Sequence, residues 1–66
     1  MKELKISLRA ARVNAGLTQE EVAKRIGKNK QTVINWENGR TPIDLGNFAL
    51  LCNMYGFSER NIILPT

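Results

Sequence analysis

A run of amide and basic side chains between residues 26 and 36 is the part of this 66-residue chain best suited to chemistry. No Asp or Glu occurs from Ile26 to Trp36, so no carboxylate in this run would repel a phosphate group. Gln and Asn can bond bidentately to adenine, Lys can reach the acceptors of guanine, and the Thr methyl group can contact that of thymine. The residues suited to this are Asn29, Lys30, Gln31, Thr32 and Asn35. The run is typical of a surface that meets double-stranded DNA in the major groove.

Two short helices around a tight turn are needed to present this run. The first is expected to open with the capping-box pair Thr18 and Glu21 and to end at Gly27. Gly27 tolerates the positive φ of a tight turn, and Ala23 is small enough for two backbones to approach. The second helix is expected from Asn29 to Glu37. The residues facing inward would be Val22, Ile26, Val33 and Trp36. This pattern predicts a helix-turn-helix over about residues 18–37.

The remaining segments also have helical length and clear stop signals. The expected helices run from Ser7 or Leu8 to Ala15, from about Asp44 to Tyr55, and from Glu59 to about Ile63, the last capped by Ser58 and stopped by Pro65. The buried residues of the second of these would be Leu45, Phe48, Ala49, Leu51, Cys52 and Tyr55. Sustained alternation of apolar and polar residues is absent, so no sheet is expected. The sequence predicts an all-α fold, a compact five-helix domain over residues 1–66.

The basic residues are concentrated in the first part of the chain. Residues 1–40 hold nine of the ten Lys and Arg and four of the six acids, a net charge of +5, whereas residues 41–66 carry −1. This asymmetry indicates a polyanionic partner for the first part. A solvated basic surface is the alternative explanation.

Several function classes lack the residues they need. The chain has no His, no glycine-rich phosphate loop and no clustered carboxylates, so we expect no enzyme, no metal site, no cofactor and no small-molecule ligand. Cys52 is the only cysteine and is expected in the core. No apolar run approaches the roughly 20 residues of a membrane span, and the first residues do not resemble a signal peptide. A cytoplasmic protein is therefore expected.

An ordered set of motifs carries a family resemblance. It comprises Leu8-x-x-x-Arg12, Gly16-Leu17-Thr18-Gln19-Glu20-Glu21-Val22-Ala23, Ile26-Gly27, Val33, Trp36-Glu37-Asn38-Gly39-Arg40 and Tyr55-Gly56-Phe57-Ser58. With this spacing the chain resembles the phage repressor/Cro (XRE-type) helix-turn-helix family over roughly residues 7–64. The resemblance implies a lambda-repressor-like DNA-binding domain and a sequence-specific regulator of transcription.

The resemblance also implies roles for matched positions. Lys30, Gln31 and Asn35 would be the principal base readers, with Asn29 and Thr32 at base edges or the backbone. Phosphate contacts would come from Gln19 at the amino end of the second helix, and from Asn38 and Arg40 after the third. Arg12 and Glu37 would form a structural ion pair between the first and third helices.

Lys28 departs from the family pattern, because an apolar residue often packs beneath the turn at this position. Lys cannot be buried there cheaply, so we expect its ammonium group to point outward and to add a phosphate contact.

Four assignments have simpler alternatives. Asn29 would serve equally well as an N-cap only, and Gln19 as an ordinary first-turn residue. Asn38 is at least part of a helix stop, and Arg12 with Glu37 could be two solvated charges. Trp36 could be imagined stacking on a base, but its spacing from Val33 favours the core.

One such domain buries little DNA surface, so a homodimer on a palindromic operator is expected. Candidate dimer surface is apolar and lies at Leu50, Met54, Phe57, Ile62, Ile63 and Leu64. Some of these residues must cover the core. A second candidate is Met1–Ile6, as a short strand or arm. The length suggests a Cro-like or minimal phage-type repressor. The alternative is a helix-turn-helix protein that acts mainly through protein contacts, of antitoxin or coactivator type.

Overall fold

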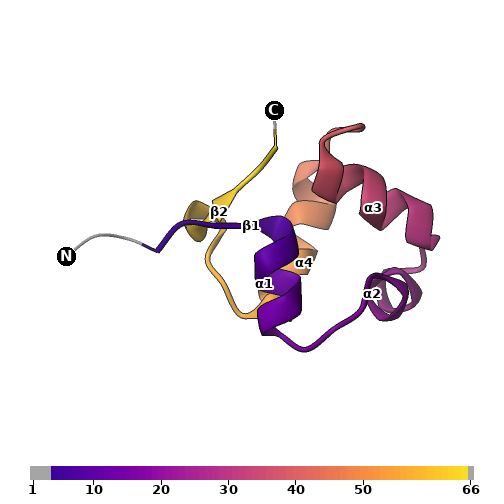
Figure 1. The fold of residues 1–66 in the computed structure, drawn as a ribbon, viewed down its shortest axis with the longest axis horizontal. Coiled ribbons are helices and arrows are strands. Elements are labelled where there is room, and N and C mark those ends of the chain that lie inside the picture. The colour runs from indigo at the N-terminus through magenta and orange to yellow at the C-terminus, as the bar shows by residue number, and fades with distance from the viewer. Residues whose placement is uncertain (1–3, 66) are drawn as a thin grey trace.

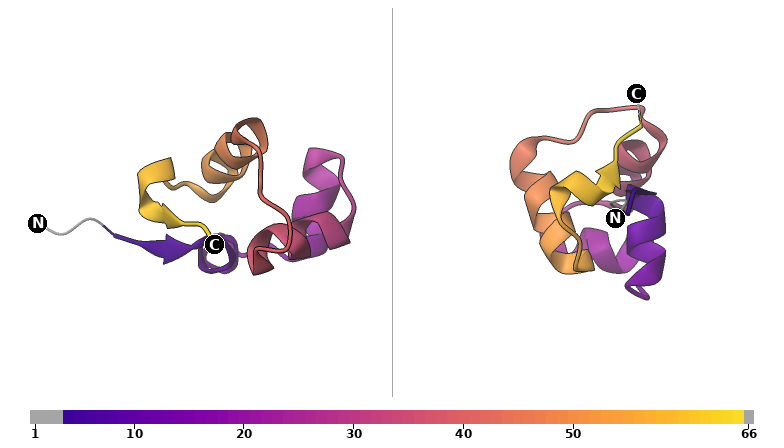
Figure 2. Two further views of the ribbon diagram at one scale, coloured as in Figure 1. Left: turned by 90° about the horizontal axis from the view of Figure 1, so that it is seen from above. Right: turned by 90° about the vertical axis from the view of Figure 1, so that its left-hand side faces the viewer.

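The computed structural model describes residues 4–65 and contains, within that range, four α-helices. They are α1 (Leu8–Asn14), α2 (Gln19–Ile26), α3 (Lys30–Asn38) and α4 (Leu45–Tyr55). Helices α1 and α4 lie in the middle of the molecule, and α2 and α3 form one end of its long axis (Figure 1). Figure 2 shows from above that two short strands occupy the other end.

Each α-helix begins after a side chain that caps it. Ser7, Thr18, Asn29 and Asp44 stand directly before the four helices, and each accepts a hydrogen bond from the backbone amide three residues later. Glu21 completes the capping box, because its Oε1 accepts from the Thr18 backbone amide at 2.9 Å. Caps of this kind contribute about 1 kcal/mol each. The predicted starts of the first four helices are confirmed.

One hydrophobic cluster joins the helices. Its buried members are Leu8, Ala11, Val22, Ala23, Val33, Trp36, Phe48, Leu51, Cys52, Tyr55 and Ile62. The side chains of Val22 and Val33 are fully buried, which places the inner faces of α2 and α3 in this core. Trp36 is 6% exposed, so it packs in the core as the sequence predicts.

The predicted fifth helix is wrong, and so is the expectation that the chain forms no sheet. Ser58 makes no side-chain capping bond, and a single 3-10 turn, η1 (Glu59–Asn61), is followed by strand β2 (Ile62–Ile63). Strand β1 (Ile6–Ser7) pairs with β2 in parallel, with Ile6 opposite Ile62. Branching at Cβ favours extended backbone for isoleucine, and this conformation buries Ile62 in the core.

Two expected core residues of α4 are exposed. Leu45 is 80% exposed, and Ala49 is also on the surface. The buried stripe of α4 follows Phe48, Leu51, Cys52 and Tyr55; Ala49 lies about 100° around the helix from Phe48. At the beginning of α4, Ile43 from the preceding loop packs against the core. The prediction placed this apolar contact two residues too late.

Tyr55 buries a hydroxyl group without a hydrogen-bond partner among residues 4–65. Its side chain belongs to the core, and the residue is 5% exposed. Burial, followed by the negative charge of Glu37, raises the pKa of Tyr55 to about 12 from its usual 10.0. The neutral phenol is therefore the form that the folded state accepts.

We predict that the stability of the protein falls above pH 10 partly because of Tyr55. The unfolded phenol ionises near pH 10, whereas the folded one keeps its proton until about pH 12, so the free energy of unfolding decreases over that interval. At about pH 11 the loss is about 1 kcal/mol. Tyr55→Phe should lack this loss and match the wild type near pH 7, because no hydrogen bond is removed. Urea unfolding of both proteins at the two pH values measures it; identical losses would contradict the assignment to Tyr55.

Candidate nucleic-acid interface

The connection between α2 and α3 sets the position of α3. Gly27 adopts φ +71° after α2, and the backbone amide of Lys28 donates to the carbonyl of Ala23 at 2.9 Å. Ala23 is almost fully buried, as the close approach of the two helices requires. The tight turn predicted from these residues is therefore present, and it leaves one face of α3 outside the core.

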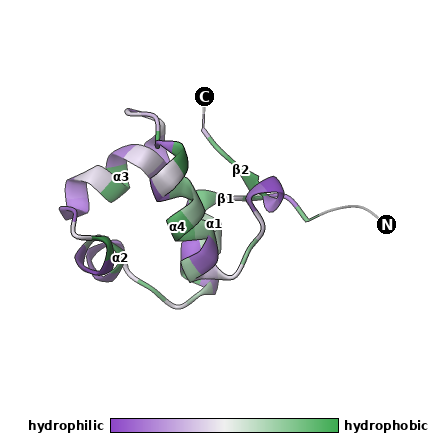
Figure 3. Cartoon of the chain, turned by 180° about the vertical axis from the view of Figure 1, so that it is seen from behind, coloured by the Kyte–Doolittle hydropathy of each residue, from purple (hydrophilic) through white to green (hydrophobic). Residues whose placement is uncertain are grey.

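The outer face of α3 presents the predicted base readers. Asn29, Lys30 and Gln31 are exposed, and Thr32 and Asn35 are partly exposed. Figure 3 shows that α3 is mostly hydrophilic or neutral, in contrast to the largely hydrophobic α4. All five side chains are thus at least partly accessible, four of them on α3 and Asn29 at its N-cap.

Asn29 acts as the N-cap of α3. Its Oδ1 accepts from the backbone amide of Thr32 and from the Thr32 hydroxyl group, each at 2.8 Å. The Nδ2 group of Asn29 still has two hydrogens that could donate to DNA. The capping role is therefore present, and it leaves the second role, at a base edge, chemically open.

Gln31 and Asn35 are bonded to each other on this face. Gln31 Nε2 donates to Asn35 Oδ1 at 2.9 Å. Side chains four residues apart on a helix are neighbours, so the pairing was visible in the sequence as two amides at this spacing. The sequence-based prediction names both residues as base readers and does not include this bond.

A buried ionic network fastens α3 to the first two helices. Arg12 Nε donates to Glu37 Oε2 at 2.7 Å, and Arg12 Nη2 donates to Glu37 Oε1 at 3.3 Å. The remaining side of the guanidinium group donates through Nη1 to the Leu17 carbonyl at 2.9 Å. The side chains of Arg12 and Glu37 are only 10% and 2% exposed. The two charges are therefore paired in the interior and are not two solvated groups.

Gln19 joins the same network. Its Nε2 donates to Glu37 Oε1 at 2.9 Å, a contact that sequence analysis missed because the two residues are 18 positions apart. One hydrogen of the Gln19 amide group remains for a phosphate oxygen. Gln19 also lines an open hollow at the beginning of α2, together with Arg12, Leu17, Thr18, Glu20 and Lys30.

The other candidate phosphate contacts border α3 at both ends. Asn38 and Arg40 are exposed, and the Arg40 backbone amide donates to the Asn35 carbonyl at 2.9 Å, which holds the chain close to α3. Lys28 is also exposed, as expected.

Hydrogen bonds from Asn47 lower the pKa of Asp44, with a smaller contribution from the charge of Lys28. The ammonium group of Lys28 therefore also acts on the carboxylate that caps α4.

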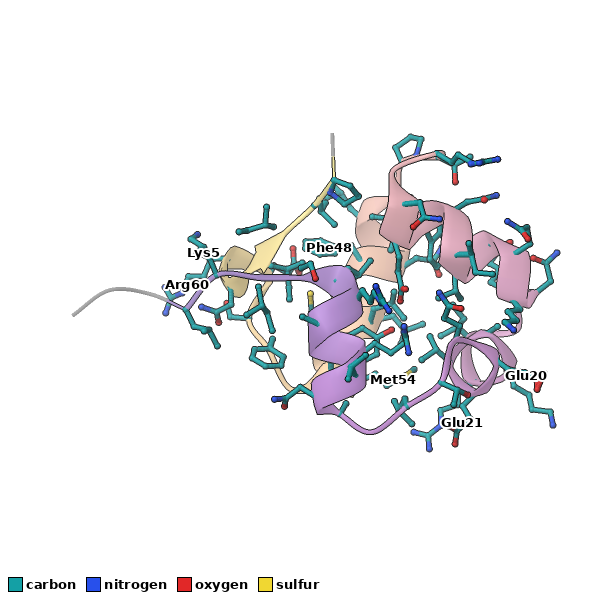
Figure 4. All side chains as sticks on the ribbon, viewed as in Figure 1. Lys5, Glu20, Glu21, Phe48, Met54 and Arg60 are labelled. Atoms are coloured by element: carbon teal, nitrogen blue, oxygen red, sulfur yellow. The ribbon has the colours of Figure 1, made fainter. Side chains whose placement is uncertain are left out.

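The basic residues do not all belong to this end of the molecule. Lys5 and Arg60 lie at the opposite end from α2, which carries Glu20 and Glu21 (Figure 4). Lys5 Nζ donates to the Arg60 carbonyl at 2.6 Å. The candidate interface therefore includes only some of the basic residues in the first part of the chain.

The residues of the candidate dimer surface differ in how far they are exposed. Ile62 is 8% exposed and belongs to the core, so its assignment to an exposed surface is corrected. Leu50 and Ile63 are exposed, whereas Met54, Phe57 and Leu64 are partly buried against the core. Within the second candidate, Met1–Ile6, residues 1–3 lie outside the described range, and Ile6 is taken up by β1.

Two features are absent from residues 4–65, the part of the chain that the structure describes. No helix there combines the length and the apolar character that crossing a membrane would require. That part of the chain also contains no group of three or more His, Cys, Asp or Glu placed to hold a metal ion.

Comparisons with known proteins were made for the whole chain. It matches the model of a helix-turn-helix family over residues 8–62. It is similar to the crystal structure of a hypothetical transcription factor, NHTF, from Neisseria, with 33% sequence identity and a TM-score of 0.74. The match covers 88% of this chain and 65% of that chain, so this chain spans less than two thirds of the other's length. A search of curated proteins gave no match.

We predict that Glu37→Leu strongly destabilises the fold. The substitution leaves the buried guanidinium group of Arg12 without its carboxylate, which typically costs about 3–5 kcal/mol. The double variant Arg12→Met/Glu37→Leu should be more stable than Glu37→Leu alone, because no unpaired charge remains. Urea unfolding followed by circular dichroism gives the free energies of unfolding.

Glu20→Leu is the control for that experiment, because it removes an exposed acid from the same region and should change stability by less than about 0.5 kcal/mol. Equal losses for Glu20→Leu and Glu37→Leu would contradict a structural role of the buried pair.

Proposed function

The chain belongs to the XRE-type helix-turn-helix family, and on this basis we propose that it is a DNA-binding, non-enzymatic regulator of transcription. The similar structure from Neisseria is described as a hypothetical transcription factor, which supports the same class of function. More specifically, we propose a Cro-like or minimal phage-type repressor that binds a palindromic operator as a homodimer.

The outer face of α3 is the observation that carries this proposal. It combines three amide side chains, one Lys and one Thr, and no acid occurs between Ile26 and Trp36. These groups match the donors, acceptors and methyl groups that base pairs present in the major groove. The opposite face of α3 is buried through Val33 and Trp36, so the reading groups are held on a rigid element.

Phosphate contacts would frame this reading helix. Asn38 is its last residue and Arg40 lies just beyond its end, Lys28 precedes it, and Gln19 at the beginning of α2 lines the hollow together with Lys30. Contacts of this kind position a protein on the duplex without reading sequence. The Arg12–Glu37 pair would keep α2 and α3 in one fixed relation during binding.

Dimerisation would bring two reading helices about one DNA turn (~34 Å) apart. The exposed Leu50 and Ile63 and the partly buried Met54, Phe57 and Leu64 are the apolar residues that we propose for this contact. They come from α4 and the C-terminal segment, whereas the reading face belongs to α3, so one protomer could use both surfaces at once.

Selection of bound duplexes from a random pool tests sequence-specific binding. We expect the wild type to recover a consensus with two inverted half-sites, whose spacing would give the dimer geometry. Gln31→Ala should lose discrimination at one base pair of each half-site at least, while Asn53→Ala, at an exposed position of α4, should recover the wild-type consensus. Recovery of no consensus by the wild type would favour a protein that acts through protein contacts.

A salt titration tests the phosphate contact of Arg40. We expect Arg40→Ala to weaken binding to all sequences and to reduce the slope of log K against log salt by about one per protomer, because one phosphate contact is lost. Arg60→Ala is the matched control, since it removes the same charge at the opposite end of the molecule. If Arg40→Ala relaxes the preference at one base pair instead, the residue reads a base and not a phosphate.

A further inference from the structure

The bond between Gln31 and Asn35 lies in the middle of the proposed reading face. The two residues are four positions apart on α3, and the distance between Gln31 Nε2 and Asn35 Oδ1 is 2.9 Å. Gln31 is exposed and Asn35 is partly exposed. The two amide groups are therefore bonded to one another at the surface of α3.

The bond fixes the orientation of the two amide groups relative to each other. It uses one hydrogen of Gln31 Nε2 and one lone pair of Asn35 Oδ1, so Gln31 Oε1 and Asn35 Nδ2 lie on the far sides of the pair. Turning Gln31 alone would place two oxygens opposite each other, and turning Asn35 alone would place two NH₂ groups opposite each other. The two amides can consequently reverse only together.

We propose that Gln31 and Asn35 read DNA as one coupled unit, in which their mutual bond directs each amide group to an adenine. This inference rests on the proposed function. Adenine presents one donor, N6, and one acceptor, N7, which complement the oxygen and nitrogen of an amide group. Guanine presents two acceptors, O6 and N7, so one of them would face the amide oxygen and repel it. Because the pair is already ordered, less side-chain entropy is lost on binding than for two free amides.

A coupled unit and two independent readers predict different effects of substitutions on base preference. Independent readers would each determine the preference at one base pair. In the coupled unit, a change at Gln31 also alters how Asn35 is presented, so the preference at the second base pair changes without a substitution at Asn35.

Two substitutions of equal charge distinguish these cases. Asn35→Asp keeps an oxygen opposite Gln31 Nε2, so the bond and the orientation of the Gln31 amide group persist. Only the donor at position 35, the Nδ2 group, is lost. Gln31→Glu removes the donor of the bond, and Asn35 must turn its Nδ2 toward the new carboxylate. Each variant adds one negative charge to the same face, so their non-specific loss of affinity for DNA should be similar.

Selection from a random duplex pool is the readout for the wild type and both variants. We expect Asn35→Asp to change one base pair per half-site, from adenine toward cytosine, and to keep the adenine assigned to Gln31. We expect Gln31→Glu to change the preference at both base pairs. The inference is overturned if Gln31→Glu changes a single base pair. If the wild type selects no consensus, the proposed function itself is wrong, and this inference with it.

Alanine variants give a second measurement that does not depend on new carboxylates. On the selected duplex, each single variant should reduce the adenine-over-guanine discrimination at the other residue's base pair by about two- to tenfold, as expected for coupled neighbours. Circular dichroism verifies that both variants fold. Unchanged discrimination at the other residue's base pair in both variants would show two independent readers and overturn the inference.

Discussion

The carboxylate of Glu37 is the group on which the arrangement of the helices depends. It is 2% exposed, and a buried charge is tolerated only when donors satisfy it. Those donors come from α1, through two nitrogens of Arg12, and from α2, through the amide of Gln19. Arg12 in turn binds the carbonyl of Leu17 in the connection between these helices. One residue of α3 thus links three segments of the chain, and the pose of the proposed reading helix follows from it.

Because this network holds α3 in place, one side of the helix can pack in the core while the other side faces solvent. Its inner side supplies Val33 and Trp36 to the core, while its outer side carries Lys30 and the bonded pair of amides. A helix of nine residues would be marginal alone in water. The Asn29 cap, the Gly27 turn and the buried pair together compensate for that, so the outer side is free of any structural requirement for apolar residues.

The helices of the molecule differ in how hydrophobic they are. Helix α3, at one end of the long axis, is mostly hydrophilic or neutral, whereas α4, in the middle of the molecule, and β2 are largely hydrophobic (Figure 3). The parallel pairing of β1 and β2 closes the other end, where Ile62 enters the core. The exposed apolar residues Leu50, on α4, and Ile63, on β2, lie on elements other than the helix proposed to read DNA. This separation would allow one protomer to contact a second protomer and a duplex without competition.

The sequence by itself determined what depends on neighbours within about four positions. The caps Ser7, Thr18 and Asn29, the αL turn at Gly27 and the core side of α3 all follow from such local patterns. Tertiary structure decided the contacts between residues far apart, such as Gln19 with Glu37 and Ile6 with Ile62. It also exposed Leu45 and replaced the fifth helix by a 3-10 turn and a strand. These outcomes depend on which segments compete for the same core volume, and no local pattern records that competition.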